Sequence, residues 1–259
     1  MEIIFWNVNN KKRAIDIIAK SDFIGTKRLF AFAEYWDIDD YISRQLYEKD
    51  FWIDDVKKRT GFVNSKLKLK LKEASRYYTQ LSIDYNGIEV YVWIVHLKAQ
   101  LNSESVSDSL NAELIKGIIG EINTKNLKHS LIIGDFNISH FDHKMFDFFL
   151  LNSTHYFNEE DPEEKVFDGY KRIKFYNPIA ALSGDISKGP PGTHYYNLPN
   201  QSQAWHVYDI ALVSYSLSQY LDKEKCEIVT ELNGFTLSKA NGRPNTEISD
   251  HFPIRIKFL

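Results

Sequence analysis

The sequence has few of the residues that would mark a disulfide-stapled protein, a zinc finger or a membrane protein. Its 259 residues include a single cysteine, Cys226, which excludes an intramolecular disulfide and a cysteine-rich zinc site. It has no apolar run of membrane-spanning length, and Met1 is not followed by the basic and apolar segments of a signal peptide. We therefore expect a cytoplasmic protein with no membrane partner.

The chain also lacks a strong excess of charge of either sign. Its net charge of −3 and its pI of about 6.3 argue against a protein that coats nucleic acid by charge alone. They are compatible with an enzyme that holds a metal, because a bound cation supplies its own local positive charge. Since 43% of the residues are hydrophobic and 14% are aromatic, we expect a large core and no long disordered stretch.

Short β-branched and aromatic runs alternate with amphipathic segments along the whole chain. The pair Asn86-Gly87 lies between two such runs, residues 76–85 and 88–97, and predicts a tight antiparallel hairpin. The other expected strands are residues 3–8, 29–35, 131–136, 207–213, 227–232 and 254–258, and the expected helices are residues 13–20, 39–49, 109–122 and 144–151.

This mixture of strands and helices predicts an α/β (α+β) sandwich, with two packed mixed β-sheets flanked by helices, in a single domain of residues 1–259. Residues 152–204 carry few periodic signals. A structureless span of that length is unusual in a compact domain, so we expect hidden short elements or a functional loop there. Loops around a site often select the substrate, which makes this segment the candidate for that role.

Polar and acidic residues lie at the predicted ends of the strands, where a hydrophobic core would not favour them. A carboxylate in an apolar strand costs several kcal/mol unless it is paired, hydrogen-bonded or bound to a metal. Each residue also has a structural explanation: Glu34 could pair with an arginine, His96 could be a core histidine, and Asn137 could form a turn. Together, their many oxygen atoms suit Mg²⁺ or Mn²⁺. The set comprises Asn7, Asn9, Glu34, His96, Asp135, Asn137, Asp209, Asp250 and His251.

The motifs that contain these residues resemble those of the endonuclease/exonuclease/phosphatase superfamily, and they follow the family's order from residue 5 to residue 253. A single Gly-Asp-x-Asn match would be weak, but the ordered set is specific. The matching segments are Phe5-Trp6-Asn7-Val8-Asn9, Phe32-Ala33-Glu34, Val95-His96-Leu97, Gly134-Asp135-Phe136-Asn137, Trp205-His206-Val207-Tyr208-Asp209 and Ser249-Asp250-His251-Phe252-Pro253.

The sequence departs from the family pattern at two places. Asn9 stands where many nuclease members carry an aspartate, which leaves one fewer acid near the metal. No arginine immediately precedes the strand of Asp209, and His206 occupies that neighbourhood. Both departures affect how many metals and which substrate we expect the protein to bind, more than they affect the expected reaction.

The resemblance implies a four-layer sandwich and a divalent-metal-dependent hydrolase of phosphodiester bonds, and we expect a nuclease acting on DNA (or RNA). It implies that Glu34 binds Mg²⁺ (or Mn²⁺), with Asn7 in or beside the coordination shell and Asp250 binding a metal or bracing the site. The physical requirement is general, because a phosphodiester attacked by water needs a cation, a base and donors aimed at the developing charge.

The resemblance also implies catalytic roles for five residues. Asp209 would orient His251 as the general base; in the competing family mechanism Asp135 activates the water and His251 holds the phosphate. Asn137 and His96 would hydrogen-bond the phosphoryl oxygens.

Two further segments bear on the substrate. Residues 66–72 alternate lysine with leucine, so a strand there would place Lys66, Lys68, Lys70 and Lys72 on one face. That face is either a charge-protected sheet edge or a phosphate-contact surface. Residues 192–196 combine glycine with aromatic residues that could stack on bases or form a packed turn. We expect the substrate-binding residues to be Asn9, Lys98, Thr193 and Tyr195.

The sequence is also compatible with other functions. An enzyme of the same fold could act on a small phosphorylated molecule or a lipid headgroup, and the sequence discriminates poorly against this. A catalytically silent binding module is disfavoured because the acidic and histidine residues are all present. A metal-stabilised structural domain is disfavoured by the lack of a His/Cys zinc cluster.

Overall fold

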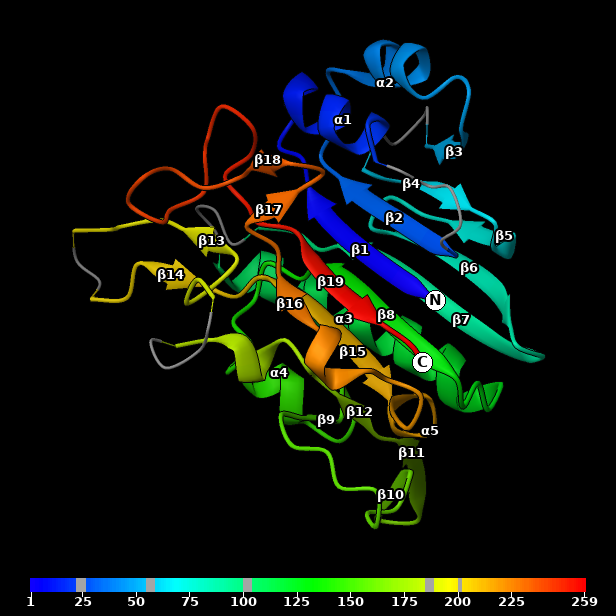
Figure 1. Ribbon diagram of the computed structural model, residues 1–259. Coiled ribbons are helices and arrows are strands. Elements are labelled where there is room, and N and C mark those ends of the chain that lie inside the picture. The colour runs from blue at the N-terminus through cyan, green and yellow to red at the C-terminus, as the bar shows by residue number, and fades with distance from the viewer. Residues whose placement is uncertain (22–26, 55–58, 100–103, 185–188, 200–201) are drawn as a thin grey trace.

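Two large β-sheets face each other and enclose the hydrophobic core (Figure 1). The computed structural model describes residues 1–21, 27–54, 59–99, 104–184, 189–199 and 202–259. The first sheet has the order β16 (Glu227–Ile228), β19 (Ile254–Lys257), β1 (Glu2–Asn7), β2 (Arg28–Ala33), β4 (Thr60–Ser65) and β3 (Asp50–Ile53). Only β1 and β2 run parallel within its described pairs.

The second sheet has seven strands and is also mixed. Its order is β5 (Lys68–Ala74), β6 (Tyr78–Tyr85), β7 (Ile88–His96), β8 (Ser130–Asp135), β15 (Asp209–Ser214), β12 (Phe175–Tyr176) and β9 (Ser153–Thr154). The pairs β7–β8 and β12–β9 are parallel, and β6 and β7 form the antiparallel hairpin predicted from Asn86-Gly87.

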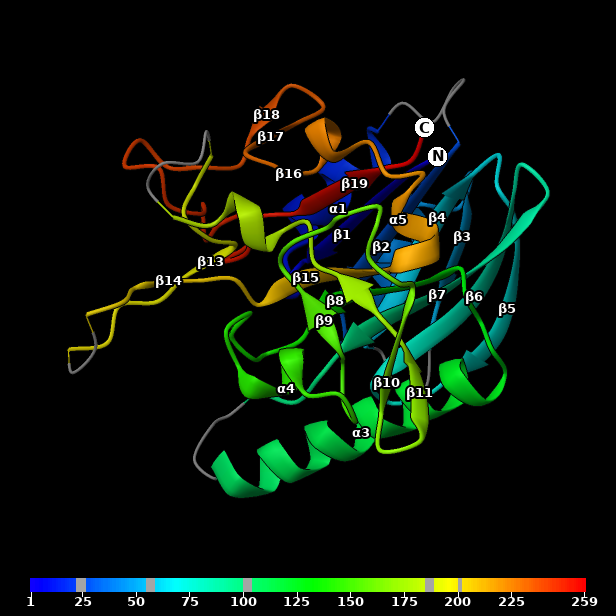
Figure 2. The same ribbon diagram turned by 90° about the horizontal axis from the view of Figure 1, so that it is seen from below.

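Helices cover the outer faces of both sheets. The first helices, α1 (Lys12–Ala19) and α2 (Asp39–Gln45), lie against the first sheet, and the long α3 (Glu104–Thr124) lies against the second (Figures 1 and 2). The predicted sandwich of two mixed sheets flanked by helices is confirmed. Among the described residues, no helix is both long and apolar enough to cross a membrane.

Burial on both faces explains the apolar composition of the central strands. Every residue of β1 after Glu2 is buried, including Phe5 and Trp6, because one face packs on the opposite sheet and the other on a helix. Burying each such side chain contributes roughly 1.5–3 kcal/mol. The amphipathic α1 buries Ala14, Ile15, Ile17 and Ile18 on one side, as helical spacing requires.

Several predicted boundaries need correction: α2 ends at Gln45 and not at residue 49, α3 spans Glu104–Thr124 and not residues 109–122, and two further elements differ more. The helix expected over residues 144–151 is only α4 (His143–Phe146), because Asp147 adopts an extended conformation and ends it. The strand expected over residues 227–232 is two short strands, β16 and β17 (Glu231–Leu232). The chain leaves the first sheet between them, and β17 pairs with β18 (Phe235–Thr236) instead.

The long segment of residues 152–204 contains hidden short elements, as predicted. Beside β9 and β12, the described residues form a hairpin of β10 (Glu164–Phe167) and β11 (Tyr170–Ile173), a 3-10 turn η1 (Ala180–Leu182), and β13 (His194–Tyr195), which pairs with β14 (Trp205–His206). The remaining short helices are α5 (Tyr215–Ser218) and η2 (Lys223–Lys225).

The lysine-rich strand lies at the edge of the second sheet, which confirms the edge-strand interpretation. The predicted single face of four lysines is wrong. Lys66 lies in a turn with a φ of 57°, and a register shift between Leu71 and Glu73 breaks the alternation before Lys72 can continue it. Lys72 also forms a 3.5 Å ion pair with Glu89, which offsets part of the positive charge.

Candidate active site

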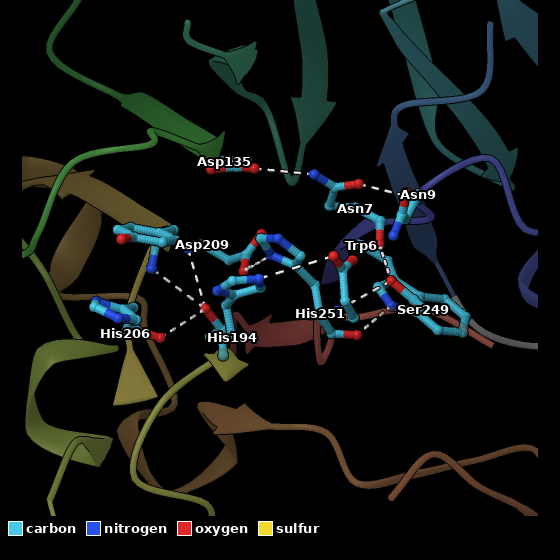
Figure 3. A network of polar contacts seen from close by, with 12 residues as sticks. Trp6, Asn7, Asn9, Asp135, His194, His206, Asp209, Ser249 and His251 are labelled. Carbon is cyan, nitrogen blue, oxygen red and sulfur yellow. Dashed lines mark hydrogen bonds and ion pairs between the residues drawn. The ribbon is translucent and has the colours of Figure 1, made fainter. Parts of the chain in front are cut away.

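The ends of the central strands bring the predicted residues together. In the register of the first sheet, Asn7 lies opposite Ala33 at the ends of β1 and β2. Glu34 directly follows Ala33 in the sequence and so lies beside Asn7. In the other sheet His96 pairs with Asp135 at the ends of β7 and β8. The sheets meet at this edge, where Asn7 Nδ2 donates a 2.9 Å hydrogen bond to Asp135 Oδ2 (Figure 3).

Glu34 is held in place by the backbone and by a histidine from the opposite sheet. Its φ of 60° is uncommon for a residue with a side chain, and such strain often occurs at functional sites. Its Oε1 lies 3.0 Å from His96 Nε2. Burial alone would raise the pKa of Glu34, but the hydrogen bond and charge of His96, with a hydrogen bond from Asn7, lower it. Glu34 is therefore an ionised carboxylate at neutral pH.

Asp209 and His251 form the hydrogen-bonded pair that was predicted. Asp209 Oδ2 lies 2.7 Å from His251 Nδ1, and both side chains are buried. The main chain of His251 is fixed by a bond from Trp6 Nε1 to its carbonyl (2.9 Å) and by Ser249 Oγ, which accepts from its N–H (3.1 Å). Burial would lower the pKa of His251, but the charge and hydrogen bond of Asp209 outweigh it and raise that pKa to about 10.

Asp135 lies directly across the antiparallel pair from Asp209 and is almost completely buried. Its Oδ1 accepts a 2.9 Å hydrogen bond from the backbone N–H of Asn137, and its Oδ2 accepts from Asn7. Burial raises the pKa of Asp135, and the negative charge of Asp209 raises it further. This carboxyl group therefore has a stronger affinity for a proton than an ordinary aspartate.

No protein-family model and no curated protein matches this sequence. Solved structures do match its fold over the full length. The 3′ phosphatase NExo from Neisseria, bound to a product DNA hairpin, has a TM-score of 0.61 at 15% identity, with 100% of this chain and 99% of NExo covered. This chain has the endonuclease/exonuclease/phosphatase fold.

Two other structures with this fold carry different ligands. TDP2 from D. rerio, complexed with a single-strand DNA product, has a TM-score of 0.60 at 15% identity and is covered over 98% of its length, against 100% of this chain. Beta toxin from Staphylococcus aureus, with bound magnesium ions, has a TM-score of 0.56 at 14% identity, with 99% of its length and 100% of this chain covered. The resemblance inferred from the motifs is thus confirmed for the fold.

A divalent cation fits the residues at this edge of the fold. Glu34, His96 and Asp135 each offer a ligand atom, and these atoms lie within 4.8 Å of one another. Asp209 Oδ1 and Asp250 Oδ1 are buried without a hydrogen-bond partner among the described residues. Carboxylates crowded together out of water need positive charge nearby, and oxygen donors of this kind suit Mg²⁺ or Mn²⁺.

Two of the predicted phosphoryl donors have partners within the protein. Asn137, with a φ of 51°, donates from Nδ2 to the Leu97 carbonyl at 3.0 Å, and no other described residue accepts from this amide group. His96 is buried and its Nε2 contacts Glu34. Phosphoryl binding by Asn137 and by His96 stays a prediction; His96 also contacts the Glu34 carboxylate.

Asp250 lies beside a histidine that the sequence reasoning did not single out. His194 Nε2 is 3.8 Å from Asp250 Oδ2, and its ring centre is 4.5 Å from that of His251. Burial would raise the pKa of Asp250, but the His194 and His251 imidazoles outweigh it and lower it to about 2. The signal for His194 was its position in the aromatic segment of residues 192–196, but its partner lies 56 residues away in the sequence, which no local pattern shows.

The four predicted substrate-binding residues have different environments. Thr193 is a correction: it is fully buried, and its Oγ1 accepts hydrogen bonds from the N–H groups of Tyr208 and Asp209 at 3.3 Å, so it braces the β15 strand. Asn9 and Lys98 are half-buried. The N–H of Asn9 donates to Asn7 Oδ1 at 3.0 Å.

Lys98 and Tyr195 remain available for substrate contact. The backbone of Lys98 is held on both sides by Asn111, at 3.0 and 2.9 Å, and among the described residues its ammonium group has no hydrogen-bond or ion-pair partner. Tyr195 is half-buried and packs edge-on against Trp205, with ring centres 5.2 Å apart. Their substrate-binding roles stay predictions.

Proposed function

We propose that this protein is a divalent-metal-dependent phosphodiesterase that hydrolyses nucleic acid. The observation that carries the proposal is the meeting of the two sheets at Asn7 and Asp135, which puts the Glu34 carboxylate and the Asp209–His251 pair at one edge. Support for a nucleic-acid substrate comes from NExo and TDP2, which share the fold and are bound to DNA products.

The residues that would hold Mg²⁺ or Mn²⁺ are Glu34 and Asn7, with Asp250 as the further candidate. The cation would neutralise charge on the phosphoryl oxygens. His96 keeps the Glu34 carboxylate ionised and oriented through its 3.0 Å contact. Asn7 is oriented by its bonds to Asn9 and Asp135, so its amide oxygen has a fixed direction.

Asp135 is the group we assign as the base that accepts the proton of the attacking water. Its raised pKa makes it a better proton acceptor than an ordinary aspartate, and two hydrogen bonds fix its carboxylate. As the water oxygen bonds to phosphorus, the bond to the leaving oxygen breaks, which yields a phosphomonoester and an alcohol. The leaving oxygen takes a proton from solvent to become the alcohol.

His251 is the group we assign to the phosphoryl oxygen. Because Asp209 raises its pKa to about 10, its imidazole is positively charged at neutral pH and donates from Nε2 while Nδ1 stays on Asp209. The alternative, in which His251 is the base, requires it to be neutral. Our assignment predicts that kcat/KM declines at high pH as His251 loses its proton, and a rate that rises to a plateau there would favour the alternative.

A substrate panel tests the proposed function. Purified protein with Mg²⁺ or Mn²⁺ is incubated with plasmid, single-stranded DNA, RNA, bis(4-nitrophenyl) phosphate, a phosphomonoester and sphingomyelin vesicles. We expect cleavage of at least one nucleic acid, with a rate that falls steeply as salt is added, because each phosphate contact releases counterions. Cleavage of the monoester or the lipid alone, with every nucleic acid left intact, would contradict the proposal.

A further inference from the structure

A pocket of about 170 Å³ opens beside the catalytic residues. Most of its wall comes from the loop between β18 and the His251 segment, and the rest comes from Asp250 and from Tyr195 of the β13 strand. In Figure 1 this orange-red loop lies next to the yellow β13–β14 hairpin. The polar side chains that line the pocket are those of Tyr195, Lys239, Asn241, Arg243, Thr246 and Asp250.

The loop that carries these side chains is held by its own backbone. The N–H of Lys239 donates to the Arg243 carbonyl at 2.8 Å, and the N–H of Gly242 donates to the Lys239 carbonyl at 2.9 Å. One turn further on, the N–H of Asn245 donates to the Leu237 carbonyl at 2.8 Å. A ligand would therefore meet a preorganised loop, which reduces the entropy lost on binding.

The two cations of this loop lack carboxylate partners in the described part of the chain. Lys239 Nζ donates to Thr246 Oγ1 at 3.0 Å, and the Arg243 guanidinium lies 4.0 Å from the ring centre of Tyr195. Both side chains are exposed, and no ion pair joins either of them to another described residue. Because the pocket is lined by two cations and one carboxylate, Asp250, its lining carries one net positive charge in a chain of net charge −3, which favours an anionic ligand at the Lys239 and Arg243 end.

The pocket borders the catalytic residues through Asp250. Asp250 lines it and directly precedes His251, while Tyr195 directly follows His194, whose ring is 4.5 Å from that of His251. Figure 3 shows His194 and His251 close together. An anion in the pocket would therefore lie next to the position that we assign to the scissile phosphate.

We propose that Lys239 and Arg243 bind the backbone phosphate that neighbours the scissile phosphate in a nucleic-acid strand. This inference rests on the proposed function and adds a second phosphate position to it. A guanidinium can donate two parallel hydrogen bonds to a phosphate, and stacking on Tyr195 limits the orientations of Arg243. Lys239 supplies a second charge, and the Asn241 amide supplies a neutral donor.

The test compares two substrates that differ in the neighbouring phosphate. A single-stranded oligonucleotide has one, and bis(4-nitrophenyl) phosphate has none. For the K239Q/R243Q variant we expect KM for the oligonucleotide to rise about tenfold, with less than a twofold change in kcat/KM for the small diester. The salt slope for the oligonucleotide should fall by about 0.7, the contribution of one contacted phosphate in a single strand.

The matched control is K68Q/K70Q, which removes the same charge from exposed positions of the edge strand β5. It should leave the oligonucleotide KM within twofold of the wild type. An unchanged oligonucleotide KM in K239Q/R243Q would overturn the proposal. So would an equal loss on both substrates, because that result means the loop only supports the active site.

A binding measurement separates this inference from the proposed function. Fluorescence anisotropy of a labelled single strand, recorded with Ca²⁺, needs no turnover. K239Q/R243Q should weaken this binding about tenfold and K68Q/K70Q should not. If only K239Q/R243Q binds the strand more weakly, but the wild type cleaves no phosphodiester, the phosphate contact is supported and the proposed function fails. Equal binding of the strand by all three proteins overturns the proposed phosphate contact.

Discussion

Replacing Asp209 with asparagine removes one negative charge and keeps the shape of the side chain. Asp209 is fully buried, and its Oδ2 lies 2.7 Å from His251 Nδ1. Asp209 is the main reason that the pKa of His251 is raised from 6.5 to about 10. Without that charge the pKa should return toward its ordinary value, so that a large fraction of His251 is neutral at pH 7.5.

The size of the effect follows from the lost charge and the lost orientation. The smaller fraction of protonated His251 at pH 7.5 accounts for about a tenfold loss of kcat. An imidazole ring that is no longer fixed by a charged acceptor lowers kcat by about another tenfold. We therefore expect kcat to fall about 100-fold, which corresponds to about 2.7 kcal/mol of transition-state stabilisation. The melting temperature should change by less than about 3 °C, because packing and volume are preserved.

The assay is kcat on a phosphodiester substrate together with the pKa of His251 from NMR titration. The control is Asp84→Asn, which removes the same charge from an exposed position on β6. A kcat for Asp209→Asn within threefold of the wild type would refute the reasoning. A His251 pKa that stays unchanged in the variant would refute it as well.

Three further predictions concern the metal, the fold and acid stability. Chelation should abolish turnover, and Glu34→Gln should raise the metal concentration for half-maximal rate at least tenfold; activity in excess chelator would contradict this. Gly134→Ala should prevent folding or lower the melting temperature by more than 10 °C, because its Cβ would lie 1.9 Å from the Val95 carbonyl oxygen. Gly117→Ala, with nothing within 4 Å, should stabilise helix α3 slightly, and equal effects of the two changes would refute the packing argument. Burial lowers the pKa of His140 to about 4, so the unfolded chain binds more protons than the folded chain between pH 4 and about 6.5. Stability should therefore fall by up to about 3 kcal/mol as pH drops through this window, and His140→Gln should reduce the loss seen in denaturant titrations.

The site residues at strand ends were predictable because each is a polar residue at the end of an apolar run in the sequence. Asn7 and Asp135 end apolar strands and Glu34 follows one, and parallel strands in register place their ends together. The pairing of Asp209 with His251 needed the family resemblance, since Asp209 begins β15 of the second sheet and His251 lies just before β19 of the first. The structure confirms their 2.7 Å contact.

Contacts that depend on how separate sheets and loops pack together could not be predicted. The 3.0 Å contact of His96 with Glu34 depends on how the two sheets pack, and neither strand's sequence encodes that distance. Thr193 looked like a loop residue because of the preceding glycine, yet its hydroxyl accepts two backbone N–H groups of the next strand. Arg243 stacks on Tyr195 across 48 residues of sequence.

The central claim is that water attacks phosphorus at this edge of the sandwich. The most direct measurement is hydrolysis of a phosphodiester with Mg²⁺ in water enriched in oxygen-18, followed by mass spectrometry of both products. We predict that the heavy oxygen appears in the phosphomonoester and not in the alcohol, and that Asp135→Asn and His251→Ala each lower its rate of incorporation at least 100-fold. Heavy oxygen in the alcohol, or incorporation at the wild-type rate in both variants, would contradict the account.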